Sequence, residues 1–109
     1  FNLCPENSNH PGYCTEKVFE AIKAGCIPLY WGSDNKPEPD ILNHDSILFI
    51  NPFEPNVEAL KLISDINSNR SVYLDFINQN NFLQDAPDII YNYFLNLEEK
   101  IKAMASNLL

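Results

Sequence analysis

The hydrophobic positions of this chain fall into two patterns, short continuous runs and stripes with helical spacing. The runs at residues 1–4, 26–31 and 47–50 are typical of strands, and the last two have the composition of strands buried in a parallel sheet. Pro28 interrupts the second run, which favours an irregular or early strand position for this residue. The runs therefore predict three strands of a parallel sheet.

Helical spacing occupies the segments between and after these runs. A first helix is predicted over about Glu16–Ala24, with Thr15 as its N-cap and Gly25 as the left-handed residue after its end. Further helices are expected from residue 56 to about 66, at 72–77 and at 87–109. The last one carries an apolar stripe from Ile90 to Leu108, which we expect to pack on another surface.

Strands that alternate with helices are typical of an α/β domain, here a Rossmann-like unit with a parallel sheet flanked by helices. Three strands are few for such a sheet, and the chain starts with Phe1 rather than Met. We therefore expect the 109 residues to be a fragment, with further strands before Phe1.

Composition narrows the class of ligand. Seven basic and fifteen acidic residues give a net charge of −8, which is the wrong sign for general binding to nucleic acid or anionic lipid. An anionic ligand therefore requires a local positive site. The three cysteines match no zinc ribbon or CxxC spacing, so we expect reduced, mostly buried thiols in a reducing compartment.

The loop at residues 5–13 follows a strand and precedes a helix, which is where open α/β sheets bind ligands. Lys17 brings a positive charge to the predicted first turn, and the free N–H groups of that turn suit a phosphate. The Glu16 carboxylate can accept hydrogen bonds from the paired hydroxyls of a ribose or a sugar ring. Together these groups indicate a nucleotide sugar. The alternative is a solvated acid and base that merely begin a helix.

Three further loop residues have structural alternatives. Tyr13 is a donor contact or a packing residue, and Asn7 is a ligand contact or an Asx turn that closes the loop. His10 has only Glu6 at a ligand spacing, so no metal site is predicted.

The three segments FNLCPENS (1–8), YCTEKV (13–18) and AGCIPLYWG (24–32) resemble the signature block of the α1,3/α1,4-fucosyltransferases. That block reads Phe-Glu-Asn-Ser, a short variable loop, Tyr-x-Thr-Glu-Lys, an apolar helix and a strand end x-Pro-x-x-x-Gly. Residues 73–76 and the last predicted helix also resemble the bacterial members. Pro5 departs from the pattern, because the family usually has an aromatic residue there.

The resemblance implies a two-domain glycosyltransferase of GT-B type, in which residues 1–109 are the C-terminal, donor-binding domain. Such an enzyme transfers fucose from GDP-fucose, with inversion, to a hydroxyl of an N-acetylglucosamine or glucose unit of a glycan. It uses neither a cofactor nor a metal ion. Its expected location is the cytoplasm or inner membrane surface in a bacterium and the Golgi membrane in a eukaryote, with any peripheral membrane contact through segments outside this chain.

Residue roles follow from the same resemblance. Lys17 would neutralise the diphosphate, and Glu16 and Tyr13 would contact ribose or fucose. Asn7 would hydrogen-bond near the phosphates, and Glu6 and Gly32 are further members of the site. The acceptor base is expected in the missing N-terminal acceptor domain, so no catalytic residue is predicted here and the isolated chain should be inactive.

Two other functions stay open at this point. One is a transferase of the same fold that uses another nucleotide sugar, because Glu16 and Lys17 do not select guanine. The other is a non-catalytic interaction module that docks a partner through the Ile90–Leu108 stripe.

Overall fold

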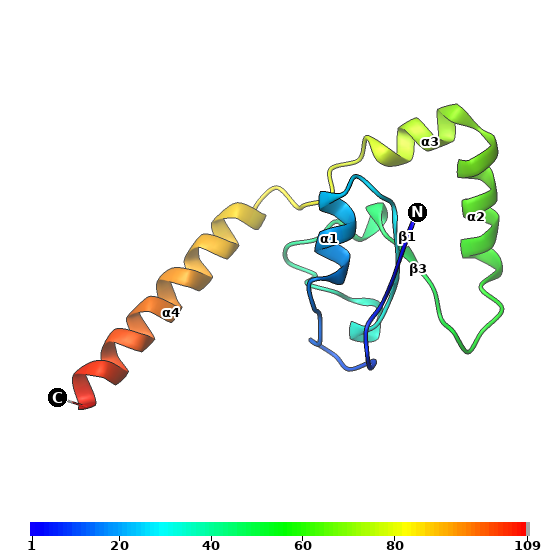
Figure 1. The fold of residues 1–109 in the computed structure, drawn as a ribbon. Helices are drawn as coiled ribbons and strands as arrows, with labels where there is room; N and C mark the ends of the chain where they lie inside the picture. Colours follow the sequence, from blue (N-terminus) through cyan, green and yellow to red (C-terminus); the bar gives the residue numbers. More distant parts are fainter. Residues whose placement is uncertain (109) are drawn as a thin grey trace.

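Three parallel strands form the centre of the molecule in a computed structural model that describes residues 1–108 (Figure 1). They are β1 (Asn2–Pro5), β2 (Pro28–Trp31) and β3 (Leu48–Phe49), and they lie in that order in the sheet. Cys4 of β1 is paired with Tyr30 of β2, which in turn is paired with Phe49 of β3. The predicted parallel sheet is confirmed, and Pro28 takes an early position as the first residue of its strand.

Helix α1 (Lys17–Lys23) packs on one face of this sheet. Its buried residues Val18 and Ala21 join Cys4 and Tyr30 in a core cluster. Gly25 follows the helix with φ +74°, and its N–H donates to the Ile22 carbonyl at 3.0 Å. The N–H of the next residue bonds to the Ala21 carbonyl, which completes a Schellman motif. The predicted left-handed residue after the helix is thus confirmed.

The opposite face is covered by α2 (Val57–Ser68) and α3 (Arg70–Ile77). Their apolar residues pack with Ile27 and Leu48, and Ile66 is the buried centre of this second cluster. The side chain of Asn69 accepts hydrogen bonds from the first turn of α3 and so starts that helix. Both helices were predicted, and they complete a sheet flanked by helices.

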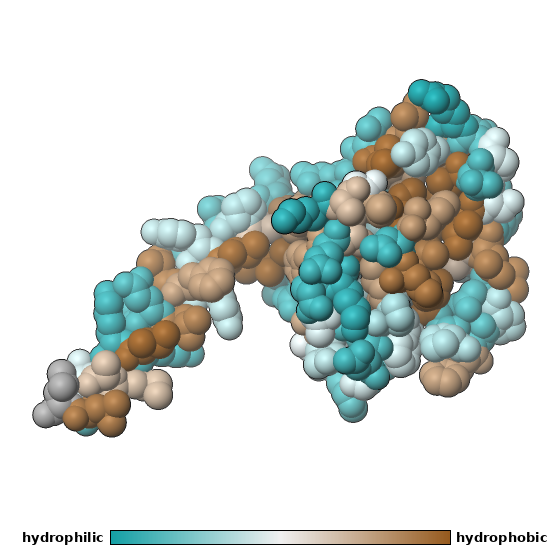
Figure 2. Space-filling model, in the orientation of Figure 1, coloured by the Kyte–Doolittle hydropathy of each residue, from teal (hydrophilic) through white to brown (hydrophobic). Residues whose placement is uncertain are grey.

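The last helix, α4 (Ala86–Leu108), projects away from the sheet and its covering helices (Figure 1). The radius of gyration is 17.3 Å, whereas a compact chain of this length has about 13 Å. Hydrophobic residues are visible along the projecting helix (Figure 2), and Phe94 and Met104 are 60% and 68% exposed. The predicted helix is confirmed up to Leu108, and Leu109 lies outside the described residues. Residues 1–85 do not cover its stripe, so the expected packing is absent from the described part of the chain.

The predicted length of the third strand was wrong. The strand has only two residues instead of four, and Ile47 before it is the C-cap of a 3-10 turn at His44–Ser46. A second 3-10 turn, Ser33–Asn35, has φ values of 50°, 53° and 54°. Left-handed backbone in three consecutive non-glycine residues is costly, and Asp and Asn tolerate it best. The Ser33–Asn35 turn therefore depends on the contacts described below.

The three cysteines are free, with Cys4 buried and the other two half-buried. None of the helices within residues 1–108 combines the length and apolar character needed to cross a membrane.

Candidate functional site

The candidate site lies at the carboxyl ends of β1 and β2. Loop 6–16 leaves β1 and the Ser33–Asn35 turn leaves β2, and since the strands are parallel both connections lie at the same edge of the sheet. Ligands of open α/β sheets bind at this edge. The fold therefore brings the predicted motif loop to the expected place.

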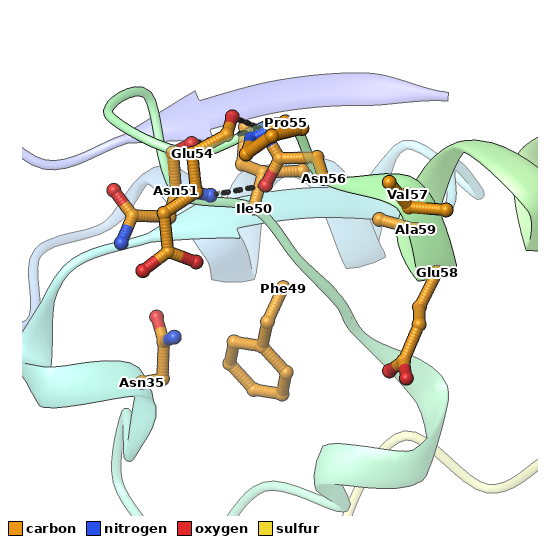
Figure 3. Close-up of a pocket in the computed structure, with 10 residues that line it drawn as sticks. All are labelled: Asn35, Phe49, Ile50, Asn51, Glu54, Pro55, Asn56, Val57, Glu58 and Ala59. Carbon is orange, nitrogen blue, oxygen red and sulfur yellow. Dashed lines mark hydrogen bonds between the residues drawn. The ribbon is translucent and has the colours of Figure 1, made fainter.

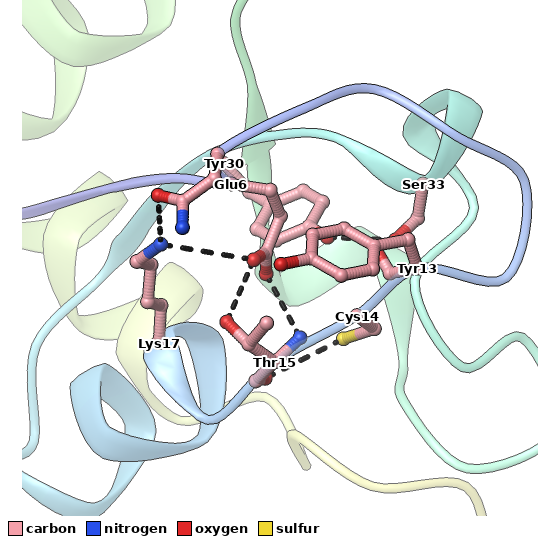
Figure 4. Close-up of polar contacts among 8 residues, drawn as sticks. Glu6, Tyr13, Cys14, Thr15, Lys17, Tyr30 and Ser33 are labelled. Carbon is pink, nitrogen blue, oxygen red and sulfur yellow. Dashed lines mark hydrogen bonds and ion pairs between the residues drawn. The ribbon is translucent and has the colours of Figure 1, made fainter.

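Glu6 is the buried centre of the site. It is 3% exposed, and its Oε2 accepts a 2.6 Å hydrogen bond from the hydroxyl of Thr15 (Figure 4). Its Oε1 accepts a second bond, of 3.1 Å, from the backbone N–H of Thr15. The sequence-based prediction made Glu6 a member of the binding site, and the structure shows both of its oxygens engaged by the protein.

Lys17 extends over this carboxylate. Its Nζ lies 3.9 Å from Glu6 Oε2 and donates to Asn7 Oδ1 at 3.2 Å (Figure 4). The side chain of Lys17 is 31% exposed, whereas that of Glu6 is fully buried. Three residues predicted for the site, Glu6, Asn7 and Lys17, thus lie in one cluster whose positive group still reaches solvent.

The prediction that Thr15 is an N-cap was wrong. Helix α1 begins at Lys17 with Glu16 in the cap position, and no side chain caps it. The hydroxyl and the backbone N–H of Thr15 both donate instead to the buried Glu6 carboxylate. Glu16 is exposed beside this cluster and leaves its carboxylate free to contact a ligand.

A second polar network holds the other end of the loop, and sequence reasoning missed it. The buried Tyr30 hydroxyl lies 2.8 Å from Ser33 Oγ, and Ser33 in turn donates to the backbone carbonyl of Tyr13. The Asn9 side chain accepts a 2.7 Å bond from the N–H of Asp34. These bonds join the left-handed turn to the motif loop and place Tyr13, which is 39% exposed, at the rim.

Burial changes the acidity of two groups in this network. Desolvation raises the pKa of Cys14 from its ordinary value of 9.0 to about 11, and the nearby Glu6 charge adds to the rise. Desolvation likewise raises the pKa of Tyr30 well above its ordinary value. Both groups are protonated at neutral pH, so neither supplies a nucleophile.

Gly32 belongs to the site through its closeness to Glu6. Its φ is +136°, and an added Cβ atom would lie 2.5 Å from Glu6 Cγ and 2.8 Å from Glu6 Cβ. Glycine at this position therefore leaves room for the buried glutamate.

A hollow of about 450 Å³ lies beyond β3, between Asn35 and the start of α2 (Figure 3). It is lined by Asn35, Phe49, Ile50, Asn51, Glu54, Pro55, Asn56, Val57, Glu58 and Ala59. Its charged lining groups are the carboxylates of Glu54 and Glu58, which would repel a phosphate. The Lys17 cluster is consequently the better candidate for an anionic ligand.

Metal chemistry has no ready ligand set in the described part of the chain, because residues 1–108 contain no group of three or more His, Cys, Asp or Glu side chains placed to hold an ion. The expectation of a metal-free site stays a prediction.

Residues 1–102 match the family model of the C-terminal part of glycosyltransferase family 10, the fucosyltransferases. The chain belongs to this family. Among family 10 relatives, an α-(1,3)-fucosyltransferase from Helicobacter pylori is 35% identical over 80 residues, which are 73% of this chain and 16% of the relative. The human 4-galactosyl-N-acetylglucosaminide 3-α-L-fucosyltransferase 9 is 30% identical over 72% of this chain and 22% of its own length.

Solved family 10 structures agree with this assignment. A crystal structure of an α1,3-fucosyltransferase with GDP-fucose superposes with a TM-score of 0.61 at 34% identity, covering 73% of this chain and 23% of that one. Another α1,3-fucosyltransferase structure gives a TM-score of 0.63. The family resemblance and the Rossmann-like α/β fold predicted from the sequence are confirmed. The chain spans less than a quarter of these relatives, so the activity of a whole enzyme is a matter for proposal.

Proposed function

We propose that this chain forms the donor-binding part of an α1,3-fucosyltransferase, in which the Lys17 cluster binds the diphosphate of GDP-fucose. The observation that carries the proposal is the geometry of Lys17, whose ammonium group stands at the carboxyl edge of the sheet, partly exposed, beside Asn7 and Glu6. Family membership supports it, as does the similarity to an α1,3-fucosyltransferase whose crystal structure contains GDP-fucose.

The charge at the site fits the chemistry of sugar transfer. When the bond between fucose and GDP breaks, negative charge grows on the diphosphate, so a fixed cation stabilises the transition state more than the ground state. Lys17 can supply that cation. Asn7 can donate its amide N–H groups to phosphate oxygens, since its Oδ1 is occupied by Lys17.

The sugar-binding roles fall to the rim of the loop. Glu16 and Tyr13 are exposed on either side of Thr15, and a carboxylate and a phenol can both bond to hydroxyl groups of ribose or fucose. The reaction is proposed to invert configuration, and the base that deprotonates the acceptor hydroxyl is assigned to the part of the enzyme outside these residues. The acceptor is proposed to be an N-acetylglucosamine or glucose unit. The proposed location is the cytoplasm or inner membrane surface in a bacterium and the Golgi membrane in a eukaryote.

The test is transfer by the full-length protein. It should convert GDP-fucose and an N-acetyllactosamine acceptor to fucosylated product, and Lys17→Met should reduce kcat/KM by about 100-fold or more. A hydrolysis assay with a panel of nucleotide sugars distinguishes GDP-fucose as the donor from the alternative, a transferase of the same fold that uses another nucleotide sugar. Absence of GDP binding in any protein that contains this chain would favour a non-catalytic module, which the exposed stripe of α4 would suit.

A further inference from the structure

We propose that Glu6 is a positioning residue, which holds the ammonium group of Lys17 and the turn at Thr15 in place for the donor diphosphate without touching the donor. This inference rests on the proposed function, in which Lys17 binds that diphosphate. From the sequence, Glu6 was expected only as a member of the site, and the positioning role gives it a specific task.

The burial of Glu6 is the first argument. Its side chain has no accessible surface, so a ligand cannot reach the carboxylate unless the loop opens. A buried carboxylate is unfavourable unless its charge is balanced and its oxygens are hydrogen-bonded. Thr15 supplies both hydrogen bonds, at 2.6 Å and 3.1 Å, and Lys17 supplies the positive charge.

The second argument concerns what these contacts hold. Thr15 lies nine residues after Glu6, so the two bonds between them close the loop that carries Asn7 and Tyr13. Lys17 follows two residues later and has a long side chain with many rotamers. Contacts with Glu6 and Asn7 restrict those rotamers before any ligand arrives, which lowers the ordering cost of binding.

The charge of Glu6 would also repel an anionic ligand, but both of its oxygens are engaged by the protein. The hydroxyl and the backbone N of Thr15 lie 2.6 Å and 3.1 Å from the carboxylate oxygens of Glu6, closer than Nζ of Lys17 at 3.9 Å. The carboxylate is thus already solvated by the protein, and Lys17 stays free to turn its remaining N–H groups to a phosphate. The positioning role therefore requires that preorganisation of Lys17 outweighs this repulsion, which the affinity measurements below test.

Gly32 provides independent support for a fixed carboxylate position. The absence of a side chain at Gly32 lets Cγ of Glu6 lie where an added Cβ would come within 2.5 Å. The Glu6 side chain therefore lies between Gly32, directly after β2, on one side and Thr15 and Lys17 on the other.

The experiment is a double-mutant cycle in the full-length protein, with GDP and guanosine affinities measured for the parent, Glu6→Gln, Lys17→Met and the double variant. Glutamine retains the shape and can still bond to Thr15, but it removes the charge that holds Lys17. Glu6→Gln should weaken GDP binding about 5- to 20-fold and leave guanosine binding within about 2-fold, because guanosine has no phosphate. In the Lys17→Met background the same change should alter GDP affinity by less than about 2-fold.

The matched control is Glu20→Gln, which makes the same chemical change at an exposed position on α1 and should leave both affinities unchanged. If Glu6→Gln does not fold, Glu6→Asp keeps the charge but draws it away from Lys17, and it should give the same selective loss for GDP.

The outcomes separate the two proposals. GDP affinity that is unchanged or tighter in Glu6→Gln, an equal loss for guanosine, or the same loss with and without Lys17 would overturn the positioning role while leaving the donor site intact. Unchanged GDP affinity in Lys17→Met would overturn the donor site and the positioning role together.

Discussion

A Cβ atom added to Gly32 would lie 2.5 Å from Cγ of Glu6, closer than side-chain carbons approach in folded proteins. The two residues come from different strand ends, β2 and β1, and meet at the edge of the sheet where the motif loop begins. Gly32 and Glu6, which both belong to the family motif, are thus also neighbours in the folded structure.

Gly32→Ala should therefore displace Glu6 and also strain the backbone at φ +136°. We expect the full-length protein to lose about 2–4 kcal/mol of unfolding free energy, measured by urea denaturation. Gly12→Ala is the matched control, because Gly12 also has positive φ but has no atom within 4 Å of an added Cβ. Its cost should be only about 1–2 kcal/mol, and equal losses in the two variants would contradict the close packing of Gly32 on Glu6.

Gly25 allows a second backbone test. The Schellman motif requires φ +74° at this position, which Val resists because of its branched side chain, whereas Asn tolerates it. Gly25→Val should destabilise the protein by about 2 kcal/mol or more, and Gly25→Asn by less than about 1 kcal/mol. Thermal unfolding of the pair measures the difference, and similar melting temperatures would show that backbone strain is not the cause.

Lys17→Ala should affect both turnover and stability. From the sequence alone, Lys17 is a solvated first-turn residue with little influence on folding, but the structure pairs it with the buried Glu6 carboxylate. Its removal leaves that charge with the Thr15 donors alone, at an expected cost of about 1–3 kcal/mol. Urea denaturation beside activity assays gives both values. Lys23→Ala, at the exposed end of α1, should change neither, and a Lys17→Ala variant as stable as the parent would show that the ion pair contributes nothing to folding.

Stability should fall in alkaline solution through Cys14. Its thiol has a pKa near 9.0 when exposed and about 11 in the fold, so the unfolded chain loses the proton first. Between these values the folded state binds more protons, and unfolding free energy therefore decreases as pH rises from about 9 to 11. The raised pKa of Tyr30 acts in the same direction. A Cys14→Ser variant should show a shallower decline in urea midpoint over this range, and identical slopes would exclude the thiol as a cause.

The 109-residue chain on its own should bind GDP weakly and transfer no fucose. Transfer requires the acceptor hydroxyl, its base and the anomeric carbon within roughly 3–3.5 Å of one another, and the base is assigned outside these residues. Incubation of the purified chain with GDP-fucose and N-acetyllactosamine tests this by mass spectrometry. Product above that of a boiled control would place the acceptor base inside residues 1–109.

Local signals in the sequence were sufficient for much of the fold. The left-handed position of Gly25 and the early strand position of Pro28 depend on backbone preferences that a single residue carries. The resemblance to the fucosyltransferase motif implied that Lys17 and Asn7 share one site, and the structure brings their side chains within hydrogen-bonding distance.

Long-range pairings could not be predicted in the same way. Thr15 is a residue type favoured at N-caps. Its hydroxyl and backbone N–H donate instead to the carboxylate of Glu6, nine residues earlier in the chain. The bond from Ser33 to the Tyr13 carbonyl spans twenty residues, and it is this contact that supports a left-handed turn for which local preference is weak. Such features follow from tertiary packing and leave no periodic pattern.

The short bridge between Leu42 and Phe82 has a mechanical consequence for the rest of the chain. Its bonds, Asn43 N–H to Asn81 carbonyl at 2.9 Å and Leu83 N–H to Ile41 carbonyl at 2.8 Å, tie the segment that leads into α4 to residues 41–43. A helix of 23 residues is about 35 Å long, so a rotation of about 10° at this bridge would displace its far end by about 6 Å. Small rotations at the bridge are therefore amplified along α4. A pair of spin labels on α1 and near residue 104 would detect them as large changes in the distance between the labels.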